Sequence, residues 1–317
     1  MSTVPSEPAR RAASPLLVVF LDGVGLAAPG PDNPLSSQPL PALEALVGGP
    51  LVAGCGGRRN GCGVAEIDAT LGVAGLPQSA TGQTALFTGI NAAERLGRHV
   101  AAYPGPRLKQ ILEADGLLAR AGAAGREVAF ANAFRPETLR EMAAGRRRVS
   151  AMVYLATSAG VALRSTADLA AGRAVSWDLE RDLVRRGIEA ELPPVSPEAS
   201  GRDLVRLAAR HDLTVFDCFL TDLAGHRRFG LVPEEAARRV DRLVAGLLDE
   251  RPAEMTLLIC SDHGNLEEAG HRRHTRNRVP LVAVGPAREA FAGARSLLDV
   301  TPGIARALDI DGVDPFP

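Results

Sequence analysis

Short, unbroken apolar runs recur along this chain, and segments with helical periodicity separate them. The first run is Leu16–Leu21, and later runs lie at 128–131, 213–219, 257–260 and 279–284. Apolar runs of this length are typical of strands that are buried on both faces of a sheet. When such strands alternate with helices, parallel pairing and helices on both faces are favoured. The sequence therefore predicts an α/β fold with a mostly parallel sheet and helices on both faces.

The connecting segments supply the helices of this fold. Residues 84–96, 106–121, 201–210 and 234–250 have helical patterns, and each segment predicts one helix. The segment around Ser79 then lies at or just before the N-terminus of the first of these helices.

One part of the chain lacks the rhythm of strands and helices. Residues 134–199 are polar, rich in arginine and interrupted by proline, which predicts a small inserted cap or lid. The polar start, 1–14, predicts a disordered tail. Residues 15–133 and 200–317 then form the core that contains the sheet.

Composition limits the class of protein. The chain has 317 residues, 46% hydrophobic and 23% charged, with a formal net charge of −1. Proteins that bind nucleic acids or membrane surfaces usually carry a basic excess, so neither partner is expected. The start of the chain does not resemble a signal peptide, and the run Leu16–Leu21 is too short to span a bilayer. Scattered cysteines favour free thiols, and a cytoplasmic location is expected; the sequence leaves the oligomeric state open.

Polar residues gather where the predicted strands end. In parallel α/β sheets the carboxyl ends of the strands share one edge, and ligands bind there. The residues expected at this edge are Asp22, Asp222, His226, Asp262, His263 and His274, with Ser79 from the helix N-terminus. Mixed carboxylate and imidazole ligands suit Zn²⁺ or Mn²⁺ better than Ca²⁺. These side chains suffice for two ions, although a polar surface loop around 261–274 is the alternative.

Two metal ions at one site indicate phosphoryl transfer, because two ions can stabilise both the attacking and the leaving oxygen. The hydroxyl of Ser79 would then be the nucleophile. The N-terminus of its helix would offer backbone N–H groups to the phosphate oxygens. The expected partner is therefore a small phosphorylated molecule.

Four short motifs contain these residues. They are Leu21-Asp22-Gly23-Val24-Gly25, Gln78-Ser79-Ala80-Thr81-Gly82, Thr221-Asp222-Leu223-Ala224-Gly225-His226, and Ser261-Asp262-His263-Gly264 with His274-Thr275. In this order they resemble the alkaline phosphatase superfamily, and most closely its branch with cofactor-independent phosphoglycerate mutase and phosphopentomutase. The string at 274–281 is particularly close to those mutases. The resemblance covers roughly residues 14–132 and 200–310.

The resemblance implies an assignment for each ligand. One metal is held by Asp222, His226 and His274. The other is held by Asp22, Asp262 and His263, with the nucleophile Ser79 beside it. Thr81 is a rival nucleophile, but Ser79 has the family's distance from the segment at 86–89. Whether the ions are Mn²⁺ or Zn²⁺ stays open.

The chain also departs from the mutases. They have a histidine where this chain has Gln83, and their inserted domain is large, whereas 134–199 is short. A mutase must enclose its phosphorylated product while it reorients. We therefore expect a phosphatase-type hydrolase with a phosphoserine intermediate; the alternatives are a phosphomutase and a catalytically inactive metal-binding protein. The sulfatase motif is missing after the first aspartate motif.

Other polar or aromatic residues have weaker patterns. His271 is expected to be a solvated neighbour of His274, while His99, Asn132 and Trp177 fit a structural role as well as a functional one. Several arginines flank the metal ligands, of which at most one or two are expected to bind substrate. They are Arg227, Arg228, Arg272, Arg273, Arg276 and Arg278.

Overall fold

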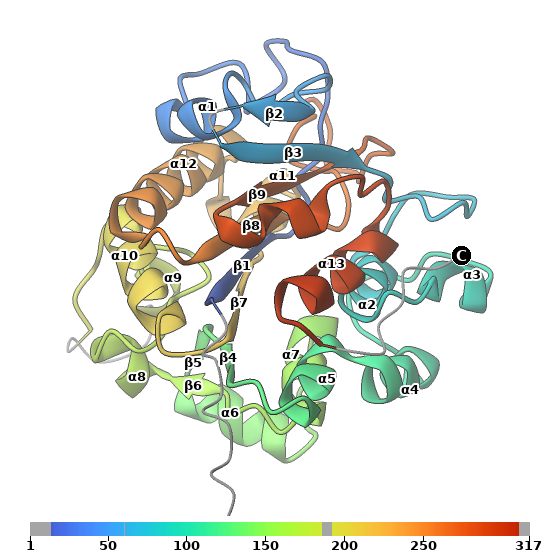
Figure 1. Cartoon of the computed structure of the whole chain (residues 1–317), viewed down its shortest axis with the longest axis vertical. Helices are drawn as coiled ribbons and strands as arrows, with labels where there is room; N and C mark the ends of the chain where they lie inside the picture. Colours follow the sequence, from blue (N-terminus) through green and yellow to red (C-terminus); the bar gives the residue numbers. More distant parts are fainter. Residues whose placement is uncertain (1–13, 60, 186–191, 311–317) are drawn as a thin grey trace, which may run out of the picture.

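The computed structural model of the protein describes residues 14–59, 61–185 and 192–310 (Figure 1). The tail predicted at 1–14 lies outside this part of the chain except for its last residue. Residues 186–191 of the predicted cap and 311–317 of the predicted core also lie outside it.

Seven strands form one sheet within the described residues, in the order β2-β3-β9-β8-β1-β7-β4. Their bounds are β1 (Leu16–Leu21), β2 (Gly57–Arg59), β3 (Cys62–Ile67), β4 (Val128–Phe130), β7 (Leu213–Cys218), β8 (Thr256–Cys260) and β9 (Val279–Val284). Strands β4, β7, β1 and β8 are adjacent and parallel. Strand β9 is antiparallel to β8, β3 to β9, and β2 to β3. Only β9 and β2 therefore oppose the common direction, and the mostly parallel sheet is confirmed.

Helices cover both faces of this sheet (Figure 1). Their bounds are α1 (Pro41–Val47), α2 (Ser79–Thr88), α3 (Ala92–Leu96), α4 (Pro106–Asp115), α5 (Leu117–Ala123), α6 (Pro136–Ala143), α7 (Ala151–Ser158), α8 (Thr166–Ala170), α9 (Asp182–Arg185), α10 (Pro197–Ala208), α11 (Leu220–Gly225), α12 (Pro233–Glu250) and α13 (Val300–Ala307). Short 3₁₀ helices occupy η1 (Arg228–Gly230), η2 (Pro286–Phe291) and η3 (Leu297–Asp299).

The central strand β1 explains the unbroken apolar pattern. Leu17 and Val19 belong to the core that also includes α10 and α12. Val18 and Phe20 belong to the opposite core, with α2, α7 and α13. Successive side chains of a strand point to opposite faces, so a strand buried on both sides needs an apolar residue at every position.

Two helices that the sequence predicts as single elements are each interrupted. The predicted helix at 84–96 is wrong. Helix α2 starts at Ser79 and ends at Thr88, and Gly89, whose φ of 74° is left-handed, caps it before α3 begins. The predicted helix at 106–121 is also two helices, α4 and α5, which meet at Gly116. A Cβ atom at Gly116 would overlap the carbonyl oxygen of Leu112. Glycine thus permits both breaks, and apolar spacing alone does not reveal them.

The predicted cap, 134–199, contains two kinds of structure in its described residues. Helix α7 packs against α2, α4, α5 and the main core. The rest includes α8, α9 and a two-stranded parallel sheet of β5 (Ala133–Phe134) and β6 (Arg164–Ser165), beside a small apolar cluster of its own. The division of the chain at 134 and 199 remains a prediction.

Two expectations from composition concern membranes and cysteines. No helix in the described ranges is both long and apolar enough to cross a membrane. Cys55, Cys62, Cys218 and Cys260 are all free thiols.

Candidate metal centre

The order of the strands brings the predicted site residues together. Asp22 directly follows β1, Asp262 lies two residues after β8, and Asp222 lies in α11 directly after β7. Because β8, β1 and β7 are parallel neighbours, their carboxyl ends share one edge. Strand β9 runs back against β8, so the loop at 261–278 leaves this edge and returns to it with His274.

Asp22, Asp262, His263 and Ser79 form the first part of the site. The Nε2 atom of His263 is 3.3 Å from Asp22 Oδ1 and 3.7 Å from Asp262 Oδ2. The same nitrogen is 3.0 Å from Ser79 Oγ. One oxygen from each aspartate and one nitrogen of His263 lie within 4.8 Å of one another, which is close enough to share an ion.

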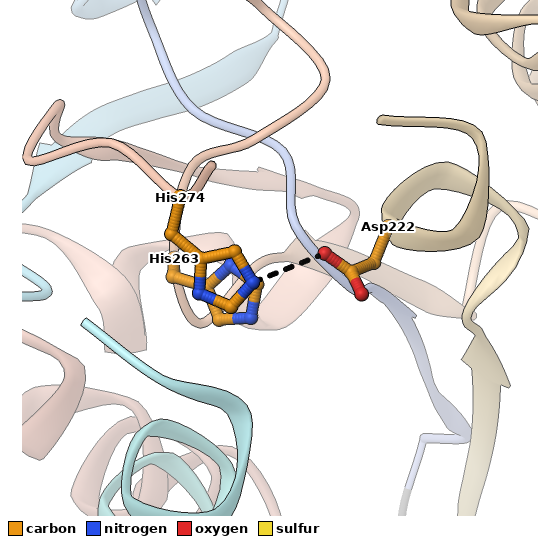
Figure 2. Close-up of side chains that lie close together, drawn as sticks. All are labelled: Asp222, His263 and His274. Carbon is orange, nitrogen blue, oxygen red and sulfur yellow. Dashed lines mark ion pairs between the residues drawn. The ribbon is translucent and has the colours of Figure 1, made fainter. Parts of the chain in front are cut away.

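Asp222, His226 and His274 form the second part. The Nε2 atoms of His226 and His274 are 3.4 Å and 3.5 Å from carboxylate oxygens of Asp222, and 3.1 Å from each other. Figure 2 shows that the ring of His263 stacks on that of His274, with centroids 3.8 Å apart. His263 also lies within ligand distance of Asp222 and His274. The two parts are therefore contiguous, and His263 lies where they meet.

Backbone carbonyls orient the three imidazoles. The Nδ1 atoms of His226 and His274 each lie 2.8 Å from a carbonyl oxygen, that of Arg272 and Pro77 respectively. The Nδ1 atom of His263 lies 3.4 Å from the carbonyl oxygen of Gly264. Since a carbonyl only accepts, each Nδ1 must donate its N–H. The nitrogen left to face the cluster is therefore Nε2 in each ring, and it can bind a metal once it carries no proton.

Two buried carboxylate oxygens, one from Asp22 and one from Asp262, indicate whether the cluster can bind a cation. Asp22 Oδ1 and Asp262 Oδ2 lack a hydrogen bond of regular geometry, and both face the imidazole of His263, at 3.3 Å and 3.7 Å. Burial, together with the charge of Asp222, raises the pKa of Asp22, and burial raises the pKa of Asp262 well above its usual value. A buried charge is costly unless it is paired or binds a metal. These residues therefore fit a site for divalent ions.

The two stacked histidines have opposite proton affinities in the metal-free protein. Burial disfavours the imidazolium of His263, but the carboxylates of Asp262 and Asp22 outweigh that effect and raise its pKa to about 10. Burial, followed by the neighbouring charge of His263, lowers the pKa of His274 to about 4. His263 is therefore protonated near neutral pH, and His274 is not.

The local structure separates the two possible nucleophiles. Ser79 is the first residue of α2, and its hydroxyl lies beside His263. The fully buried Thr81 donates its hydroxyl to the carbonyl oxygen of Gln78 at 3.1 Å and accepts the N–H of Val100 at 3.1 Å. The hydroxyl of Thr81 is thus used within the fold, and the geometry favours Ser79.

The residues that the sequence left undecided have varied surroundings. The side-chain amide of Asn132 donates to the carbonyl of Asp217 at 2.7 Å and accepts its N–H at 2.8 Å, which joins β4 to β7. His271 lies 3.0 Å from Glu268, outside the ligand groups. Trp177 stacks on Phe219 and packs against the main core.

The sequence also left the roles of His99 and of the arginines that flank the ligands undecided. The ring of His99 is half-buried beside the backbone of Val73 and Thr70, and burial lowers its pKa. Arg227 and Arg276 donate to backbone carbonyls of Ala269 and Gly75, which ties them to neighbouring loops. Arg228, Arg272 and Arg273 are exposed.

Sequence reasoning missed several side chains that support the ligands. Gln83, one turn after Ser79, donates to Asp22 Oδ2 at 3.3 Å. Asn265 donates to Asp222 Oδ1 at 2.7 Å. Glu267 is buried within the same loop. Gln83 stands where the related mutases have a histidine, which was a signal for that residue. Asn265 and Glu267 closely follow a predicted ligand motif, but this does not distinguish them from surface residues.

Family comparison agrees with this geometry. A family model described as the Metalloenzyme superfamily matches residues 14–311. The chain belongs to the Metalloenzyme superfamily. Members are metal-dependent phosphoryl or sulfuryl transferases and hydrolases, so membership implies that the chain binds divalent metal.

The sequence is also similar to that of a characterised relative, the 2,3-bisphosphoglycerate-independent phosphoglycerate mutase of Syntrophotalea carbinolica. The two are 32% identical over 125 residues, which cover 37% of this chain and 24% of the relative. The match thus spans about a quarter of the length of that mutase.

Solved structures show the same fold. The PH0037 protein from Pyrococcus horikoshii has a TM-score of 0.58 at 14% identity, with 95% of this chain and 98% of that chain covered. Alkaline phosphatase from the Antarctic bacterium TAB5 has a TM-score of 0.52 at 11% identity, with 95% and 100% covered. The resemblance to the alkaline phosphatase superfamily is therefore confirmed at the level of the fold.

Proposed function

We propose that this superfamily member is a two-metal phosphatase-type hydrolase that acts on a small phosphate ester through a phosphoserine intermediate at Ser79. One observation carries the proposal: Ser79 Oγ lies 3.0 Å from His263 Nε2, at the start of a helix and beside the buried carboxylates of Asp22 and Asp262. A hydroxyl in this position can attack phosphorus, and the helix N-terminus favours the negative phosphate.

Asp22, Asp262 and His263 would hold one ion, and Asp222, His226 and His274 the other. When bound, divalent ions such as Mn²⁺ or Zn²⁺ lower the pKa of a nearby hydroxyl and neutralise charge on the transferred phosphoryl group. Gln83 keeps one oxygen of Asp22 in place by its hydrogen bond. Asn265 does the same for Asp222.

The reaction has two halves. Ser79 Oγ loses its proton and forms a bond to phosphorus, while the bond from phosphorus to the ester oxygen breaks and the alcohol departs with a proton. In the second half, water forms a bond to phosphorus and the bond to Ser79 Oγ breaks. The products are inorganic phosphate and the regenerated serine.

Hydrolysis is favoured over mutase chemistry by the size of the insertion. Part of the segment between Ser79 and Asp222, helix α7, contributes to the main core rather than to a cover over the site. Little chain is left to enclose a reorienting intermediate. A phosphomutase remains the second candidate because the chain aligns with a phosphoglycerate mutase. In either case we expect a cytoplasmic enzyme.

The test compares Ser79→Ala with the unchanged protein, both loaded with Mn²⁺ or Zn²⁺ and offered a panel of phosphomonoesters. We expect Ser79→Ala to lose activity by about 10³-fold or more while it still binds metal. Thr81→Val is the matched control, because it removes a hydroxyl two residues away that is already used in the fold. Full activity of Ser79→Ala would disprove the proposed nucleophile.

Isotopically labelled water separates the candidate functions. A hydrolase incorporates labelled oxygen into released phosphate, whereas a mutase transfers the phosphoryl group without releasing it. If the unchanged protein binds two ions and turns over no ester in the panel, the interpretation as an inactive metal-binding protein is favoured.

A further inference from the structure

The loops that contain the candidate ligands meet at one buried carboxylate, that of Glu267. Only 1% of this residue is exposed. Its Oε2 atom accepts the backbone N–H of Gly25 at 2.9 Å and that of Asn265 at 2.8 Å. Its Oε1 atom accepts the hydroxyl of Thr275 and the side-chain amide of Asn277, the latter at 2.9 Å. Each oxygen therefore has two donors.

These donors come from separate ligand-bearing segments. Gly25 closely follows Asp22, Asn265 follows Asp262 and His263, and Thr275 directly follows His274. One carboxylate thus joins the end of β1, the end of β8 and the returning part of the loop at 261–278. Gly25 and Glu267, for example, are 242 positions apart in the sequence.

Asn265 extends the connection to the remaining segment. Its backbone N–H is held by Glu267, and its side-chain amide donates to Asp222 Oδ1 at 2.7 Å and to the carbonyl oxygen of Asp222 at 3.3 Å. Helix α11, which contains Asp222 and precedes His226, is therefore tied to the same carboxylate. Both candidate metal subsites are connected to Glu267 in this way.

Close packing around Glu267 shows that the chain makes room for it. A Cβ atom at Gly25 or at Gly264 would overlap Oε1 of Glu267. At Gly264 it would also overlap the hydroxyl of Thr275. Glycine at both positions lets the backbone approach the carboxylate closely, and at Gly25 the backbone N–H bonds to it.

Glu267 itself is unsuited to bind an ion, because its two oxygens are already saturated by four donors and it belongs to neither ligand group. We propose that Glu267 is a positioning residue that couples the two metal subsites by fixing their ligand segments relative to each other. The inference rests on the two-metal site proposed above, but it does not depend on Ser79 as nucleophile.

The central test is Glu267→Gln. The substitution keeps the shape of the side chain but removes its charge, and its new N–H₂ group faces N–H or O–H donors. We expect the affinity of both subsites for Mn²⁺ to fall together by about 10- to 100-fold, as is typical when the groups that orient metal ligands are changed. Isothermal titration calorimetry on the folded metal-free protein measures both affinities, and circular dichroism verifies that the variant is folded.

Glu66→Gln is the matched control. It removes the same charge from a carboxylate that also accepts two backbone N–H groups, those of Gly54 and Gly56, but belongs to neither ligand group. Its Mn²⁺ affinities should stay within about threefold of those of the unchanged protein. Thr275→Val provides a second variant if Glu267→Gln fails to fold. It removes one of the four donors, and we expect a smaller fall that again affects both subsites.

The outcomes separate this inference from the proposed function. If the unchanged protein binds two ions and Glu267→Gln binds them equally well, the inference is wrong and the two-metal site stands. If only one subsite weakens, Glu267 acts on a single ion and the coupling is wrong. If the unchanged protein takes up no pair of ions, the proposed function and the inference both fail.

Discussion

Metal binding should displace a proton from His263. In the metal-free protein its carboxylate neighbours, Asp262 and Asp22, raise the pKa of this imidazole to about 10 despite its burial. The ring is therefore protonated at neutral pH, and its Nε2 atom must lose the proton before it can bind an ion. Removing that proton about three pH units below its pKa costs about 4 kcal/mol, at about 1.4 kcal/mol per unit.

The sign of the effect follows from the raised pKa. As the pH rises toward about 10, less free energy is needed to deprotonate His263, so metal affinity increases. Release of about one proton gives an increase of about tenfold per pH unit. Asp22 and Asp262, whose pKa values burial raises, add proton release at the acidic end. His274, with a pKa of about 4, is already neutral there and adds none near neutral pH.

The assay is a calorimetric titration of metal-free protein with Mn²⁺ between about pH 6.5 and 8.5. Repeating each titration in two buffers with different ionisation enthalpies counts the released protons directly. His271→Gln is the matched control, because this histidine pairs with Glu268 outside the cluster and should leave the slope unchanged. An affinity that does not vary over this pH range, with no dependence on the buffer, would show that metal binding displaces no proton from His263.

Three further substitutions test the fold around the site. Gly264→Ala places a methyl group against Glu267 and Thr275, so we expect a loss of about 1–3 kcal/mol in the free energy of unfolding, together with weaker Mn²⁺ binding in calorimetry; unchanged binding would contradict the close packing. Asn132→Ala removes the side chain that pairs with the backbone of Asp217, so urea unfolding should show a loss of about 1–3 kcal/mol with Mn²⁺ affinity retained. A selective loss of affinity would instead place Asn132 in the site. Phe20→Ala deletes a fully buried ring that packs edge-on against Phe87 at 5.8 Å, and urea unfolding should show a loss of about 3–5 kcal/mol; a loss below about 1 kcal/mol would mean that the two-sided core is not as described.

The apolar pattern of the sequence was enough to predict five of the seven strands that form the main sheet in the described residues, and its motifs were enough to name the candidate ligands. An unbroken apolar run such as Leu16–Leu21 is local information, because burial on both faces demands an apolar side chain at every position. The aspartates and histidines could be located because they interrupt such runs at strand ends. The order of the motifs along the chain then sufficed to recognise the superfamily.

Two helix predictions were wrong because glycine residues interrupt the predicted segments. Residues 84–96 and 106–121 keep helical spacing across Gly89 and Gly116, although the chain changes direction at both. Apolar periodicity reports which side chains face the core, and two short helices on the same core can maintain it without being continuous.

How the ligands meet depends on the folded arrangement of the strands. The sequence did not reveal that β8, β1 and β7 are neighbours, and this order is what brings Asp262, Asp22 and Asp222 to one place. Nor did it reveal Glu267, whose carboxylate is indistinguishable in the sequence from a surface residue. Its role arises from hydrogen bonds to Gly25, Asn265 and Thr275. Strand periodicity is fixed by neighbouring residues, whereas strand order and buried hydrogen bonds depend on segments that approach each other only when the chain has folded.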